Sequence, residues 1–162
     1  MDSAYYGVVL MMALYNLFLF VSTRDRSYLW YVLFFVGVSM SMSQLALDGY
    51  AFQYLWPYAT TWAMYDKLVF GALAFLFNIQ FTRTFLRTDL YAPRIYRLQS
   101  AMMGLPALSL VLLALGFVKA ATGLQFLLAL CNPIVAFIGG VIAWRRGYQP
   151  AAYQLIALTA CG

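Results

Sequence analysis

The side chains most able to do chemistry in this sequence are uncharged amides inside long apolar stretches. Asn16, Asn78 and Gln80 interrupt runs of aliphatic and aromatic residues, and Asn132 is followed directly by Pro133. A carboxamide both donates and accepts hydrogen bonds, so these residues could bind a ligand or relay a change between helices. We favour the simpler interpretation, an interhelical hydrogen bond worth about 0.6 kcal/mol in a membrane. Pro133 removes one backbone hydrogen bond, and the resulting kink would be either a hinge or a fixed bend.

A second candidate set lies near one end of the second apolar stretch. Gln44 and Asp48 follow a serine-rich run, and Trp56 belongs to the segment 48–64, which is rich in aromatic residues and has no charge after Asp48. Aromatic rings of this kind prefer the boundary between membrane and water. We therefore expect this segment to lie on the interface or to fold over the mouth of a helix bundle, where Gln44, Asp48 and Trp56 could contact a ligand.

Small residues recur four positions apart, as Gly37 and Ser41 do, and as Ala136 and Gly140 do. Residues with this spacing share one face of a helix. Small side chains allow two helix backbones to approach closely inside a membrane. These pairs therefore predict helix contacts.

The sequence lacks the residue sets on which common catalytic sites depend. It contains no histidine, and its two cysteines, Cys131 and Cys161, sit in apolar stretches without the spacing of metal ligands. Paired carboxylates, a Ser-His-Asp group, a phosphate-binding loop and an HExxH motif are also missing. We therefore expect no enzyme activity, no metal and no cofactor in this chain.

The composition identifies the solvent of the protein. Of its 162 residues, 65% are apolar and only 9% are charged, against about 45–50% and about 25% in soluble domains. A chain this short could not bury so much apolar surface in water, so we expect the lipid bilayer to be its main partner. The net charge of +5 does not indicate a nucleic-acid partner, because the basic residues lie between apolar runs and not on a polar face.

The apolar runs are long enough to cross a bilayer, which takes about 20 helical residues. Five complete spans are predicted near residues 4–22, 28–47, 65–82, 98–118 and 122–144. A sixth begins near residue 150 and reaches residue 162, which is too short to cross. Since the runs are apolar all round and do not alternate as barrel strands do, the fold class is all-α, a polytopic transmembrane helical bundle forming one incomplete domain over 1–162.

The basic residues predict how this bundle is oriented. If the first span runs inward, one set of loops carries all the arginines, and the opposite side carries Lys67 and Lys119. Arginine-rich loops stay in the cytoplasm, so the N-terminus is expected outside. Within the inner connection 83–97, arginines alternate with apolar residues, which predicts a helix lying along the inner headgroups.

Several stretches of the sequence resemble those of one family of membrane proteins. The first helical pair carries the resemblance best, through Tyr6-Gly7, the run Ala13-Leu14-Tyr15-Asn16-Leu17-Phe18-Leu19-Phe20, and the turn Arg24-Asp25-Arg26-Ser27-Tyr28-Leu29-Trp30-Tyr31. Gly49-Tyr50-Ala51-Phe52-Gln53-Tyr54-Leu55-Trp56-Pro57 is similar to the first outer loop of the family, and Arg145-Arg146-Gly147-Tyr148-Gln149-Pro150-Ala151 to the entry of its sixth span. Together these stretches resemble the bacterial seven-transmembrane receptors with diverse intracellular signalling modules, and the resemblance covers essentially the whole chain.

The resemblance implies a sensor in the bacterial inner membrane. An extracytoplasmic ligand-binding domain would precede the spans, and a cytoplasmic output domain, such as a histidine kinase or a diguanylate cyclase, would follow them. Homodimerisation is expected by analogy with receptor kinases and cyclases. A transporter or channel is the alternative function, but no charged residue lies deep in a predicted span and no inverted repeat is visible. A membrane-embedded enzyme acting on lipids or quinones would need the catalytic set that is missing.

Overall fold

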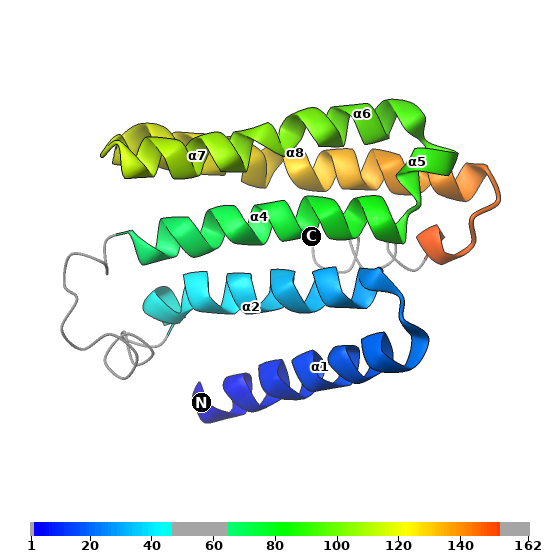
Figure 1. The fold of residues 1–162 in the computed structure, drawn as a ribbon, viewed down its shortest axis with the longest axis horizontal. Coiled ribbons are helices and arrows are strands. Elements are labelled where there is room, and N and C mark those ends of the chain that lie inside the picture. The colour runs from blue at the N-terminus through cyan, green and yellow to red at the C-terminus, as the bar shows by residue number, and fades with distance from the viewer. Residues whose placement is uncertain (1, 47–64, 153–162) are drawn as a thin grey trace.

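The computed structural model describes residues 2–46 and 65–152, and this part of the chain is helical, without strands. Its elements are α1 (Asp2–Thr23), α2 (Arg26–Ala46), α4 (Asp66–Phe85), α5 (Thr88–Tyr91), α6 (Pro93–Met102), α7 (Gly104–Ala114) and α8 (Val118–Arg145). The long helices lie roughly parallel and alternate in direction, with α6 and α7 following one another along one line (Figure 1). Helix α4 is central, because it packs against α2 on one side and against α6, α7 and α8 on the other. Helix α1 packs against α2 at the edge of the bundle.

Three segments are long and apolar enough to cross a membrane, namely Asp66–Phe85, Pro93–Ala114 and Val118–Arg145. Helix α1 contains a shorter apolar segment, Leu10–Thr23. The all-helical, membrane-type fold predicted from composition is therefore confirmed, whereas the count of five complete spans stays a prediction. Residues 150–152 are helical, and the remainder of the predicted sixth span lies outside the described residues, so that span stays a prediction.

Helix α6 corrects the sequence analysis. The connection 83–97 was expected to hold a helix lying along the headgroups, but between the end of α4 at Phe85 and the start of α6 at Pro93 it contains the four-residue helix α5. Helix α6 already begins at Pro93, five residues before the predicted span, and packs against α4 and α8. Proline is favoured in the first helical turn, where its missing N–H costs nothing. The arginines of α6 therefore belong to the first turns of a bundle helix and not to a surface helix.

The two prolines inside predicted spans have different effects. Pro106 follows the break between α6 and α7, and its missing N–H leaves the carbonyl of Met102, four residues earlier, without a helical donor. Pro133 lies inside α8, which stays helical from Val118 to Arg145. The break near Pro106 and the continuity at Pro133 show that proline alone does not decide where a membrane helix ends.

Glycines end two helices in left-handed conformations. Gly116 has φ 83°, and the N–H of Phe117 donates to the carbonyl of Leu112 over 2.8 Å. Gly147 has φ 90°, and the N–H of Tyr148 donates to the carbonyl of Ala143 over 3.1 Å. Both are Schellman motifs, which need a residue at positive φ. They reverse the chain after α7 and direct it away from α8.

Small residues create a close contact between α2 and α4, as the spacing of Gly37 and Ser41 predicts. A Cβ added to Gly37 on α2 would lie 3.2 Å from the Cα and the Cβ of Ala74 on α4. Further along the same pair of helices, the ring of Tyr31 of α2 meets that of Phe81 of α4 at a centroid distance of 5.5 Å. Near the middle of the bundle, Ile79 and Leu128 are fully buried between α4 and α8.

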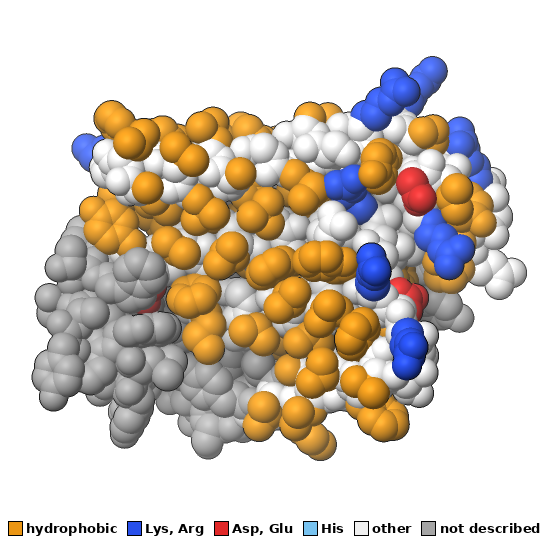
Figure 2. All heavy atoms as spheres, in the orientation of Figure 1, with side chains coloured by type: hydrophobic (Ala, Val, Ile, Leu, Met, Phe, Trp, Pro, Cys, Tyr) orange, Lys and Arg blue, Asp and Glu red, His pale blue; other side chains and the backbone are white. Residues whose placement is uncertain are grey.

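The outward faces are apolar, as a bilayer requires. Orange side chains cover much of the visible surface in Figure 2. On α1, Met11, Phe18 and Val21 are 73%, 67% and 68% exposed, and on α8 Phe126 is 67% exposed. Such a surface would be unfavourable in water and is the normal outside of a membrane bundle.

Candidate functional site

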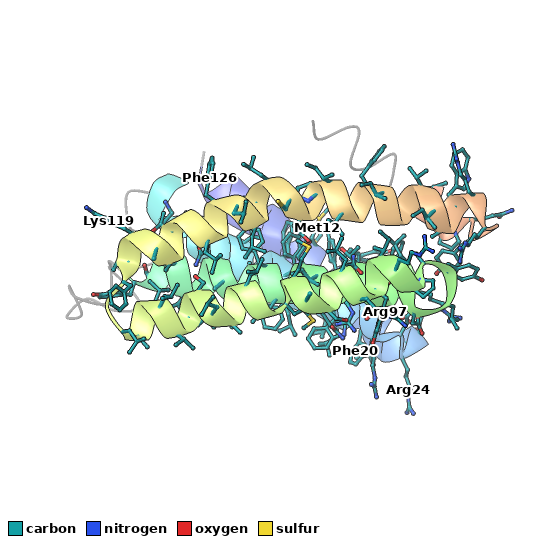
Figure 3. All side chains as sticks on the ribbon, turned by 90° about the horizontal axis from the view of Figure 1, so that it is seen from above. Met12, Phe20, Arg24, Arg97, Lys119 and Phe126 are labelled. Atoms are coloured by element: carbon teal, nitrogen blue, oxygen red, sulfur yellow. The ribbon has the colours of Figure 1, made fainter. Side chains whose placement is uncertain are left out.

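The basic residues are sorted between the two ends of the bundle. The arginine end holds Arg24, Arg26, Arg83, Arg87, Arg94, Arg97, Arg145 and Arg146, which lie in the α1–α2 turn, at the ends of α4 and α8, and around α5 and the start of α6. The lysine end holds Lys67 in the first turn of α4 and Lys119 in the first turn of α8. Figure 2 shows most of the visible blue side chains at one end, and Figure 3 places Lys119 at the end opposite to Arg24 and Arg97.

Between these ends, the interior contains polar contacts that join α4 to the helices after it. Near the lysine end, the side-chain amide of Gln125 on α8 donates to the backbone carbonyl of Leu68 on α4 over 2.6 Å. The same nitrogen donates to the hydroxyl of Ser109 on α7 over 3.1 Å. Gln125 is 8% exposed and Ser109 is fully buried, so one amide ties three helices together in a dry environment.

Helix α2 reaches the same region through Ser41. Its hydroxyl donates to the backbone carbonyl of Lys67 over 3.0 Å. Gly71 leaves the space that this arrangement needs, since a Cβ there would lie 2.9 Å from Oε1 of Gln125 and 3.5 Å from Oγ of Ser41. Four helices therefore meet around the Gln125 side chain.

The central contact joins two of the residues singled out in the sequence. The side-chain amide of Asn132 on α8 donates to Oδ1 of Asn78 on α4 over 2.6 Å. Asn132 is 7% exposed and directly precedes Pro133, whose own side chain is exposed. The backbone defect of α8 therefore lies beside its side-chain link to α4. Whether this pair transmits a signal stays a prediction.

The remaining candidates do not join this pair. The amide of Asn16 donates to the carbonyl of Met12 in its own helix over 2.8 Å. Gln80 is half-buried on α4. Gln44 belongs to α2, but its side chain is outside the described part, and Asp48 and Trp56 lie outside the described residues altogether.

Near the arginine end, Arg83 of α4 is held by groups from α6 and the α6–α7 break. Its guanidinium carbon lies 4.2 Å from the centre of the Tyr96 ring, within the range of a cation–π contact. Nη1 lies 2.8 Å from the sulfur of Met103, and Nε is buried without a hydrogen-bond partner in the described structure. Below this cation, the hydroxyl of Thr88 donates to Oε1 of the buried Gln99 over 3.3 Å.

Tyr148 closes the arginine end after α8. Its hydroxyl donates to the carbonyl of Phe85 in the last turn of α4 over 3.0 Å, and its ring stacks on Tyr91 at 5.0 Å. Burial raises the pKa of the Tyr148 phenol above its usual value of 10.0, although the nearby Arg87 cation opposes the change. The hydroxyl therefore stays protonated and remains a donor to a helix-end carbonyl that would otherwise lack a partner.

Side-chain hydrogen bonds therefore connect α4 to its neighbours at several points along its length. Gln125 holds its lysine end, Asn132 its middle and Tyr148 its arginine end. Hydrogen bonds weaken steeply with changed angle or distance, so a sliding or rotating α4 must exchange them for others. Each position of α4 relative to its neighbours would therefore have its own set of hydrogen bonds. Within the described residues, no group of three potential ligands is placed to hold a metal ion.

Sequence reasoning missed Gln125, Arg83 and Tyr148. Gln125 could have been selected on the same ground as Asn78, because it too is an amide within a strongly apolar segment. Arg83 was assigned to a loop, but α4 continues to Phe85 and places its guanidinium between helices. Tyr148 gave no signal beyond its aromatic ring, since its partner is a backbone carbonyl.

The fold and the separation of charges define a multi-pass helical membrane domain. The sequence model of the family described as "7TM diverse intracellular signalling" matches residues 1–162, the entire chain. The chain therefore belongs to this family of receptor domains, which is associated with intracellular signalling. The comparison with curated proteins and the comparison with solved structures each found no match.

Proposed function

We propose that this domain relays an extracytoplasmic ligand signal across the bacterial plasma membrane to a cytoplasmic output domain of the same protein. The output would be of the histidine kinase or diguanylate cyclase type, and the ligand would bind an extracytoplasmic domain before α1. The full-length protein would work as a homodimer. The family membership supports the signalling role.

The observation that carries the relay is the row of polar contacts along α4. They connect the lysine end to the arginine end through the middle of an apolar bundle. A ligand changes such a bundle only by binding two helix arrangements unequally. Since each interhelical hydrogen bond inside a membrane is worth about 0.6 kcal/mol, a modest binding preference is enough to exchange one set for another.

The proposed orientation places the arginine end in the cytoplasm and the N-terminus outside. It is tested by adding one cysteine at a time to a full-length protein whose own cysteines are replaced by alanine or serine. Ala120→Cys marks the lysine end and Gln149→Cys the arginine end, and both positions are exposed and uncharged. An impermeant maleimide applied to intact cells should label Ala120→Cys, and Gln149→Cys only after lysis. The reverse pattern would refute the orientation.

The relay is tested by removing the central contact. Asn132→Leu deletes the amide donor that reaches Asn78, and it should change the basal activity of the output domain in membranes containing the full-length protein. Ala129→Leu is the matched control, because it enlarges an exposed position on the same helix. Unchanged output from a normally expressed Asn132→Leu variant, or an equal change in Ala129→Leu, would retire this contact as a relay.

A further inference from the structure

A groove lies between α1 and α2 near the arginine end. Its volume is about 570 Å³, within the range of about 300–1,000 Å³ typical of small-molecule sites. The groove is lined by Phe20 and Val21 of α1, Leu29 and Trp30 of α2, and Arg24 and Arg26 at the turn between the helices. One part of its lining is therefore apolar and the other cationic.

The turn keeps the two arginine side chains exposed. Arg24 has φ 53°, which ends α1, and Asp25 lies between the two arginines. The Asp25 carboxylate accepts the backbone N–H of Ser27 over 2.9 Å and so caps the start of α2. Arg24 and Arg26 border both this groove and the neighbouring cavity beside Tyr148, whereas Asp25 lines only that neighbouring cavity. The charge presented to the groove is therefore positive.

The groove also has the right place in the bundle. Figure 3 shows Phe20 and Arg24 on the same side of the molecule. In the proposed orientation, the arginine end faces the headgroups of the inner leaflet. The assignment of the groove to the inner leaflet rests on this orientation alone. The helix segments that follow the turn continue into the depth of the hydrocarbon.

We propose that the α1–α2 groove binds an anionic phospholipid. The lipid phosphate lies between Arg24 and Arg26, because guanidinium groups bind phosphate oxygens through paired hydrogen bonds. An acyl chain lies along Phe20, Leu29 and Trp30. A soluble phosphate would satisfy the arginines but would leave this apolar wall unused, and a neutral lipid would leave the two charges without a counterion. Basic pockets between membrane helices on the cytoplasmic side are suited to such headgroups.

Trp30 makes the proposal measurable. The full-length protein is reconstituted into phosphatidylcholine vesicles that contain brominated phosphatidylglycerol or, at the same mole fraction, brominated phosphatidylcholine. Bromine quenches nearby tryptophans, and subtracting the signal of Trp30→Phe isolates the contribution of the groove. Competition with unbrominated phosphatidylglycerol then gives the relative affinity. We expect a preference of roughly 30-fold for the anionic lipid, because each arginine near an anionic surface contributes about fivefold.

The double variant Arg24→Gln/Arg26→Gln should reduce this preference to about onefold, and Arg24→Lys/Arg26→Lys should keep part of it, because charge remains without the planar fork. The matched control is Arg145→Gln/Arg146→Gln, which removes equal charge at the same end from exposed residues outside the groove. This control should keep the preference.

Three results would overturn the proposal. Equal quenching of Trp30 by both lipids would show no selectivity, and an equal loss in both glutamine variants would show only a general surface charge. Displacement of the quenching by millimolar inorganic phosphate would make the site one for soluble anions. The assay does not read the output domain or the orientation in cells, so a negative result leaves the relay proposal untouched.

Discussion

The contact of Gly37 with Ala74 allows the packing of α2 on α4 to be tested by one methyl group. In Gly37→Ala the new Cβ would lie 3.2 Å from the Cα and Cβ of Ala74 and 3.3 Å from its backbone nitrogen. Carbon atoms pack best at about 3.5–4.0 Å, so the two helices must separate by a few tenths of an ångström. Because two of the three atoms belong to the backbone, no side-chain rotation can relieve the contact.

The expected cost follows from two opposing contributions. Overpacking of a well-packed interface costs about 1–3 kcal/mol. Replacing a helical glycine by alanine returns about 0.5–1 kcal/mol. The net loss of stability for Gly37→Ala should therefore be between about 0 and about 2.5 kcal/mol. Gly123→Ala in α8 is the control, since no atom of another helix lies within 4 Å of its new Cβ. It should gain about 0.5–1 kcal/mol.

The measurement is reversible unfolding of the purified protein in mixed detergent micelles, followed by helical circular dichroism as the denaturing detergent is increased. The informative quantity is the difference between the two glycine variants, which cancels the common effect of alanine on the helix. If Gly37→Ala proves as stable as Gly123→Ala, the helices are not in the close contact described here, and the reasoning from Gly37 is wrong.

Three further perturbations address the polar contacts. Gln125→Leu removes donors to Leu68 and Ser109 at nearly constant volume and should lower the stability by about 1 kcal/mol in the same unfolding assay; an unchanged midpoint would contradict those bonds. Tyr148→Phe should cost about 0.5–1.5 kcal/mol near neutral pH. Because burial raises the pKa of Tyr148 above 10.0, the hydroxyl stabilises the fold below that pH and loses this effect as pH rises through the folded pKa. Wild type and Tyr148→Phe should therefore converge in alkaline solution, and a difference that grows there would reverse the sign. Asn16→Leu should change stability by no more than about 0.5 kcal/mol, since its amide bonds only within α1; a larger loss, or a change in the output of the full-length protein, would reveal a contact outside the described residues.

Composition and periodicity determined the class of fold. A backbone in lipid must satisfy its own hydrogen bonds, which leaves helices or closed barrels, and apolar runs near 20 residues without alternation favour helices. The predicted starts and ends of the first two helices lie within about two residues of α1 and α2. The separation of arginines from lysines also follows from the predicted spans. Successive spans run in opposite directions, so successive loops lie alternately at the two ends of the bundle.

The boundaries of α6 could not be predicted from composition and periodicity. Arg94 and Arg97 suggested a loop or surface helix, yet the preference of Pro93 for a first turn and the packing of α6 against α4 and α8 outweigh those charges at the end of the bundle. A charged residue near the end of a membrane helix costs little free energy, because its long side chain can reach the headgroups.

The sequence by itself determined that amides such as Asn78 and Asn132 must find partners, since an unsatisfied polar group in hydrocarbon costs several kcal/mol. It could not say which partners, because they lie on helices separated by loops whose geometry no local pattern records. Only the tertiary structure paired Asn132 with Asn78, directed Gln125 to a backbone carbonyl of α4, and brought Arg83 under the Tyr96 ring. Those contacts depend on the rotation of each helix about its axis. That rotation is decided by close packing at positions such as Gly37 and Gly71, and packing is a property of two surfaces together.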